Sequence, residues 1–125
     1  MADTFKLLGS YETVPLGSVQ SFAESIIASI NESVVVVHKQ VGLIDLSSDS
    51  PAAVSFGGVA SANIITMKAT GKVKARLTSA DGSVQAIPFD DYFILMSRSV
   101  PITAIDLTRV SGVATTVHVF LGEKA

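Results

Sequence analysis

Residues 64–87 read IITMKATGKVKARLTSADGSVQAI, and this stretch decides the fold class. Apolar and basic or polar side chains alternate strictly over residues 72–78, which is the pattern of a strand with one buried face. Two short breaks that contain glycine, Thr70-Gly71 and Asp81-Gly82, separate this strand from β-type runs on either side. Glycine adopts a positive φ without strain, so Thr70-Gly71 predicts a two-residue hairpin loop, and Asp81-Gly82 predicts a second turn.

Further strands follow towards the C-terminus. Pro88 is expected to close the strand that begins at Val84, because proline lacks a backbone donor. Three more segments have the apolar runs or the alternation of strands, and they are residues 92–96, 102–108 and 115–121. Strands that recur about every 8–12 residues with turns between them indicate an antiparallel β-sandwich or barrel. The sequence therefore predicts an all-β protein.

The first half of the chain is less regular. Residues 34–37 are four consecutive valines, which favours a strand that is buried on both faces. Ser21 and Glu24 fit a capping box, and apolar residues recur at helical spacing, so a single short helix is predicted near residues 22–30. A strand would also place Phe22, Ile26 and Ile30 on one face, so the pattern leaves that alternative open.

Residues 1–20 lack a sustained period and contain Gly9, Pro15 and Gly17, which interrupt regular structure. We interpret this segment as an N-terminal arm or an edge strand, and the pattern favours neither. Residues 21–125 are then a single β-sandwich domain, which fits the usual size of one folded unit.

The composition indicates a surface that is covered in an assembly. Charged residues are 16% of the 125 residues, and the mean hydropathy is +0.50. Average soluble domains carry about 25% charge, and a small domain cannot bury all of its apolar surface. We therefore expect contact with other subunits. The net charge of −2 argues against a nucleic-acid binder. No apolar run approaches the ~20 residues of a membrane span, and the first residues lack a signal peptide, so synthesis in a cytoplasm is expected.

No residue set indicates catalysis, a cofactor or a metal ion. The chain has no cysteine, and its two histidines, His38 and His118, are far apart in the sequence. Asp90-Asp91 is an adjacent carboxylate pair, but neighbours in an extended chain point to opposite faces, so a turn is the preferred interpretation. The sequence thus predicts a protein that is not an enzyme.

One group of charges and one aromatic residue stand out as candidates for interaction. The basic residues Lys68, Lys72, Lys74 and Arg76 form a stripe that could meet an anionic partner, although lysines also guard sheet edges against aggregation. Phe120 is on the face of its strand opposite Val119, which predicts that this second face is also covered.

The block from Asn63 to Glu123 resembles the small jelly-roll structural proteins of tailed bacteriophages, such as capsid decoration or cement proteins. The likeness lies in the turns quoted above, in VPITAI at residues 100–105 and in the closing VHVFLGE at residues 117–123. It implies a jelly-roll sandwich, homo-oligomers that are often trimers, and a place in the virion, where the protein clamps neighbouring subunits of the major capsid protein. It also implies N-terminal arms that contact the lattice or another copy.

The leading hypothesis is therefore a non-enzymatic virion structural protein, either a capsid decoration protein or another head or tail component. Its candidate interaction residues are Phe5, Leu7, Leu8, Lys72, Lys74, Arg76 and Phe120. The alternative is a β-sandwich that binds carbohydrate or a receptor, for which Tyr92 beside Asp90 and Asp91 is the candidate cluster. A third hypothesis is a small β-barrel enzyme, for which the sequence offers no candidate catalytic residues.

Overall fold

The computed structural model describes residues 3–13, 26–110 and 112–125, which form strands and turns. Five strands build the first sheet, and they are β1 (Asp3–Thr13), β2 (Ile26–Leu46), β9 (Thr115–Lys124), β4 (Ile64–Ala69) and β7 (Tyr92–Met96), in that order across the sheet. Four strands build the second sheet, in the order β3 (Ala52–Ala53), β8 (Ile102–Arg109), β5 (Val73–Ser79) and β6 (Val84–Phe89). The part of the chain that the structure describes contains no helix, and so none that could cross a membrane.

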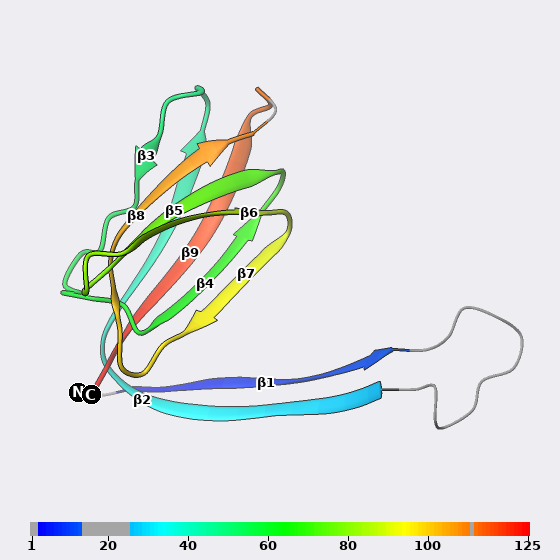
Figure 1. The fold of residues 1–125 in the computed structure, drawn as a ribbon, viewed down its shortest axis with the longest axis vertical. Coiled ribbons are helices and arrows are strands. Elements are labelled where there is room, and N and C mark those ends of the chain that lie inside the picture. Colours follow the sequence, from blue (N-terminus) through cyan, green and yellow to red (C-terminus); the bar gives the residue numbers. More distant parts are fainter. Residues whose placement is uncertain (1–2, 14–25, 111) are drawn as a thin grey trace, which may run out of the picture.

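The strand pairing is nested. β5 pairs with β6, β4 with β7, β3 with β8 and β2 with β9, and every pair is antiparallel. The chain therefore folds as one long hairpin of four strand pairs. Successive pairs along this hairpin alternate between the two sheets (Figure 1). This is the arrangement of an eight-stranded jelly roll, to which β1 adds a ninth strand beside β2. The expected all-β sandwich is confirmed.

The core lies between the two sheets, and the alternation in the sequence explains it. In β5 the residues Val73, Ala75 and Leu77 are buried, whereas Lys74 and Arg76 are exposed. Alternate residues of β4, β8 and β9 face the same interior. Leu107 of β8 and Val117 and Leu121 of β9 are completely buried there. Each strand of the sandwich thus places every second residue in the core.

β2 has 21 residues and takes part in both the sandwich and a ribbon with β1. Its C-terminal half pairs with β9, whereas residues 26–36 pair with β1. The register between β2 and β9 shifts between Val36 and His38, and such a bulge bends a strand. Beyond this point β1 and β2 continue as a two-stranded ribbon that leaves the sandwich (Figure 1). We call residues 3–13 and 26–36 the ribbon.

The predicted helix near residues 22–30 is wrong where the structure describes it. Residues 26–30 lie in β2 and pair with residues 9–13 of β1. The isoleucines of this segment are β-branched and favour extended backbone, and a partner strand supplies the hydrogen bonds that a helix would otherwise make. The capping-box residues Ser21 and Glu24 lie outside the described residues. The N-terminal segment contains an edge strand, β1, at residues 3–13.

Three local predictions also need correction. Thr70-Gly71 is not a hairpin loop, because β4 and β5 belong to different sheets and the break carries the chain between them. Pro88 lies within β6 rather than closing it, which an edge strand permits. Among the four valines, Val34 and Val36 are buried but Val35 and Val37 are exposed, since the strand is covered on one face only. The Asp81-Gly82 hairpin is confirmed between β5 and β6, with Gly82 at φ 89°.

A candidate interaction surface

A large part of the outer face of the five-stranded sheet is apolar, although no element of the described chain covers most of it. Its strands place every second side chain on this face, away from the core. Val41 of β2 is 68% exposed, and Tyr92 and Ile94 of β7 are 64% and 55% exposed. Leu43 of β2 is exposed as well. A solvated sheet face is normally polar, so this one is suited to contact with a partner.

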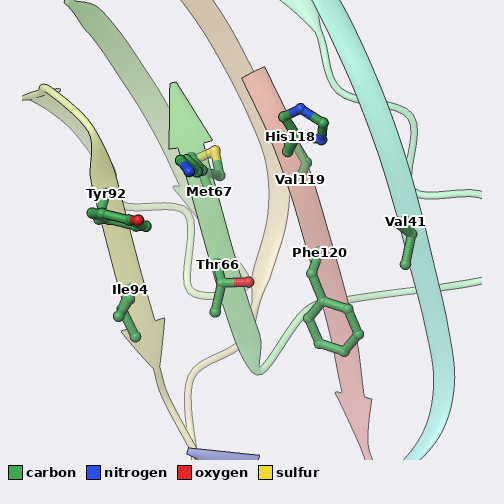
Figure 2. A pocket seen from close by; sticks show the side chains of 9 residues that line it. Val41, Thr66, Met67, Tyr92, Ile94, His118, Val119 and Phe120 are labelled. Atoms are coloured by element: carbon green, nitrogen blue, oxygen red, sulfur yellow. The ribbon is translucent and has the colours of Figure 1, made fainter. Parts of the chain in front are cut away.

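A shallow groove of about 270 Å³ runs across this face. Figure 2 shows Tyr92 and Ile94 on β7, Thr66 on β4, and His118 and Phe120 on β9, with Val41 on β2 at the other side. The amine of Lys68 lies 5.6 Å from the centre of the Tyr92 ring, which is the range of a cation–π contact. Apart from Lys68, Thr66 and His118, the groove is lined by apolar side chains and aromatic rings.

A second apolar cluster anchors the ribbon at one end of this face. Val34 and Val36 of β2 pack with Ile64 of β4, and Phe5, Met96 and Phe120 close around them. The rings of Phe5 and Phe120 are stacked, with their centroids 5.3 Å apart. Because Phe120 also lines the groove, the anchor and the groove form one continuous apolar surface. The exposed Leu43 of β2 stands opposite His118 of the groove. We call the groove, this anchor and Leu43 together the apolar face.

Among the predicted interaction residues whose side chains the structure describes, Phe5 and Phe120 come together from distant parts of the chain. Phe5 lies on Phe120, as just described, so the second face of the last strand is covered at Phe120, whereas His118 on the same face is exposed. Leu7 and Leu8 lie in the ribbon opposite Glu32 and Asn31, and their side chains are outside the described part of the structure.

The basic stripe is divided between the two sheets. Lys74 and Arg76 point outward from β5 in the four-stranded sheet, and Lys72 is exposed just before that strand. Lys68 faces outward from β4 in the other sheet, so it does not continue the stripe. Arg76 stands opposite Asp106 of β8, and the outer face of the four-stranded sheet is consequently of mixed charge.

The histidines and the acidic pair have separate positions. The Nδ1 atom of His38 lies 2.6 Å from Oε2 of Glu123, whereas His118 lines the groove. Asp90 and Asp91 form the link between β6 and β7, where Asp91 has φ 68° and the Tyr92 amide donates to the Asp90 carbonyl oxygen at 2.9 Å. The preferred turn interpretation is confirmed. Within the described ranges, no group of three or more metal-ligating side chains is placed to bind an ion.

The sequence did not single out Val41, Leu43 or Ile94, which are prominent on the apolar face. A signal was present for β2, because Val41 and Leu43 alternate with residues of the other face, such as Ile44. Both sets are apolar, so alternation of hydropathy could not distinguish the inner from the outer face. No protein-family model matches this chain, and comparisons with curated proteins and with solved structures found no match.

Proposed function

We propose that the protein is a non-enzymatic structural protein of a virion, of the capsid decoration type, which assembles through its ribbon and its apolar face. The observation that supports this most is the ribbon itself. It leaves the sandwich as two strands, and its base is continuous with the exposed apolar groove. The proposed partners are further copies of this chain and the subunits of a major capsid protein.

The ribbon and the apolar face expose apolar surface, which is unfavourable in water. A two-stranded ribbon is marginally stable by itself, and beyond the anchor at Val34 and Val36 no described strand pairs with this one as a third. The apolar face beside it adds exposed side chains such as Val41 and Leu43. Burial of apolar area contributes ~25 cal/mol per Å², and association and ordering take back part of this gain. Contacts repeated over a lattice can still stiffen a shell.

The two outer faces of the sandwich suggest an orientation. The four-stranded sheet presents Lys74, Arg76 and Asp106 outward, a mixture typical of a solvated surface. The five-stranded sheet presents the apolar face. We therefore propose that the five-stranded sheet is turned towards neighbouring subunits and that the four-stranded sheet is turned towards solvent.

Co-sedimentation of the purified chain with empty shells assembled from a phage major capsid protein tests this proposal, and the genes that neighbour its own identify which capsid protein to use. We expect binding that is weakened by Leu43→Lys, which places a charge on the apolar face, and that is retained by the matched variant Val84→Lys on the other sheet. A chain that never binds shells, or a gene that lies among metabolic genes, would contradict the proposal.

One observation favours a second candidate, a module that binds carbohydrate. The Tyr92 ring is exposed in the groove beside Lys68, and aromatic rings can stack on sugars. Asp90, which the sequence groups with Tyr92, lines a different hollow with Lys72 and Phe89. Binding to a glycan array that Tyr92→Ala abolishes would support this candidate, and an array without signal would dismiss it.

A further inference from the structure

We infer that β7 is a self-association edge, through which two copies of this chain pair antiparallel and join their five-stranded sheets into one. This inference deepens the proposed function, on which it rests only for the premise that the chain associates with itself. The partner is a second copy of this chain, and the contact is the free edge of residues 92–96.

The free edges of the two sheets differ in how they are protected. Exposed edges invite pairing with other chains, and proteins block them with short strands, prolines or charges. β3 has two residues, and β6 contains Pro88. β1 contains Asp3, Lys6 and Glu12. β7 has the sequence YFILM, without a charge, proline or glycine. Among the edge strands that the structure describes, β7 is thus the one that is longer than two residues and contains neither a proline nor a charge.

The hydrogen bonds of β7 show which of its backbone groups face outward. The Ala69 amide donates to the Asp91 carbonyl oxygen at 2.8 Å, and the Ser97 amide donates to the Asn63 carbonyl oxygen at 2.7 Å. In an antiparallel pair alternate residues bond to the partner strand, so Phe93 and Leu95 face β4 in the same way. The N–H and C=O groups of Ile94 therefore point away from β4, towards the open edge.

A two-fold axis at Ile94 pairs the whole strand with itself. Ile94 then stands opposite Ile94 of the second copy, and Tyr92 stands opposite Met96. In this register the outward groups of Ile94 bond to the same groups of its counterpart, as the antiparallel pattern requires. The side chains of these residues all lie on the apolar face, and a thioether beside an aromatic ring is a favourable contact.

The ribbon supplies the area that a pair of short strands lacks. A stable interface buries about 800 Å² on each partner, more than five residues of strand pairing provide. The ribbon packs against the ends of β9, β4 and β7 and then continues beyond β7 (Figure 1). β1 has 11 residues, and about 3.3 Å per residue gives it a reach of about 36 Å.

The symmetry decides where the ribbon goes. A two-fold axis perpendicular to the sheet keeps both apolar faces on the same side. The ribbon of each copy leaves at the Met96 end of its own β7, which is the Tyr92 end of the second copy. Each ribbon therefore crosses the groove of the other copy near Tyr92 and Lys68. A dimer is expected in solution, in place of the trimer that the resemblance implies.

Cysteine cross-linking tests the register, because the natural chain has no cysteine. The Cα atoms of a hydrogen-bonded antiparallel pair are about 5.5 Å apart, which suits a disulfide. Under oxidation we expect Ile94→Cys to give a cross-linked dimer of twice the 13.0 kDa chain mass. The matched control is Val84→Cys on the free edge strand β6, which is similarly exposed and should remain uncross-linked. Equal cross-linking of both variants would overturn the inference.

Two substitutions test the strength of the contact by light scattering over a dilution series. Ile94→Lys and Ile94→Pro should each raise the dissociation constant of the dimer at least about 100-fold, as expected for residues at the centre of an interface. Ile94→Pro removes a donor that points away from β4, so the monomer should keep its fold, which circular dichroism checks. Val84→Lys should leave the dissociation constant unchanged.

A wild-type chain that is monomeric at high micromolar concentration, or a dimer that withstands both Ile94 variants, would overturn the inference. These results are separable from the shell-binding experiment. If the chain binds shells but does not dimerise through β7, this inference alone is contradicted. If it dimerises through β7 but does not bind shells, the proposed function alone is contradicted.

Discussion

The ring of Phe5 lies stacked on the ring of Phe120, with 5.3 Å between the centroids and 24° between the planes. This contact joins β1 to β9, two strands that share no backbone pairing, because β1 pairs with β2 and β9 pairs with β2 and β4. It therefore fixes the base of the ribbon against the sandwich. The direction in which the ribbon leaves depends on this stack together with the buried Val34 and Val36.

A double-mutant cycle on Phe5 and Phe120 measures this stack. Each single substitution by alanine should lower the free energy of unfolding, and the coupling between them should be about 0.5–1.5 kcal/mol, the usual range for an aromatic pair. Urea denaturation provides the values. Phe5→Ala combined with Phe89→Ala is the control, since Phe89 contacts Phe93 in a different cluster and its effect should be additive. Additivity of Phe5 with Phe120 would show that the stack contributes nothing.

The centre of the core should be sensitive to the loss of volume. Leu107 of β8 is completely buried between the sheets, opposite Ala75 of β5 and Ala52 of β3. We expect Leu107→Ala to destabilise the fold by about 2–5 kcal/mol through lost burial and a residual cavity. The exposed Val113 is the matched site, where substitution by alanine should change stability by less than about 0.5 kcal/mol. Thermal and urea unfolding would check both.

The β5–β6 hairpin should show a pH dependence. The hydroxyl of Ser83 donates to Asp81 Oδ1 at 2.6 Å and the Ser83 amide donates to the same oxygen at 2.9 Å, and these bonds lower the pKa of Asp81 below its ordinary value of 3.8. The charged carboxylate is thus favoured by folding. Its stabilising effect is present above the pKa of the unfolded chain and is lost as the pH falls through the folded pKa.

Titration of the Asp81 carboxyl followed by NMR measures this effect. In the variant Ser83→Ala the hydroxyl donor is lost, so the pKa of Asp81 should rise towards 3.8. The variant Asp81→Asn should differ from the wild type in stability at neutral pH, and the difference should shrink as the pH falls below about 4. An Asp81 pKa that is the same with and without the Ser83 hydroxyl would refute this account.

Local patterns in the sequence predicted the strands, but not how they pair. The alternation in residues 72–78 and the Asp81-Gly82 turn depend on neighbours in the chain, and both are found. Thr70-Gly71 has the same local character as a hairpin turn, yet the chain crosses there between the sheets. Whether β4 pairs with β5 or with β7 depends on contacts between distant residues, and no turn residue encodes it.

Contacts between distant residues also explain why the helix prediction was wrong and why part of the candidate site was missed. Residues 26–30 suit a helix or a strand, and the choice was made by β1, a partner that lies earlier in the chain. Lys68 and Lys74 are close in sequence, but the crossing after β4 places them on different sheets. The stack of Phe5 on Phe120 connects the two ends of the chain. The strand pattern singled out Phe120, whereas its contact with Phe5 is visible only in the folded structure.

Asn63 should be the most sensitive polar side chain at the end of the apolar face. Its amide nitrogen donates to the Ser97 carbonyl oxygen at 2.9 Å, and its side-chain oxygen accepts from the Lys124 amide at 3.0 Å. The side chain thus joins the ends of β7 and β9 on either side of β4. We expect Asn63→Ala to cost about 1–3 kcal/mol, because it leaves a part-buried carbonyl and an amide without their partner.

The variant Asn63→Asp separates the two bonds. It keeps an acceptor for Lys124 but loses the donor to Ser97, so the Lys124 amide should stay protected from hydrogen exchange in Asn63→Asp and lose protection in Asn63→Ala. Stability should fall in both variants, because Asn63→Ala leaves the Ser97 carbonyl without its donor and Asn63→Asp places an acidic oxygen against it. If the side chain only fills space, the two variants would show equal protection at Lys124. Because Ser97 directly follows β7, loosening this bond should also weaken the proposed β7 contact between copies.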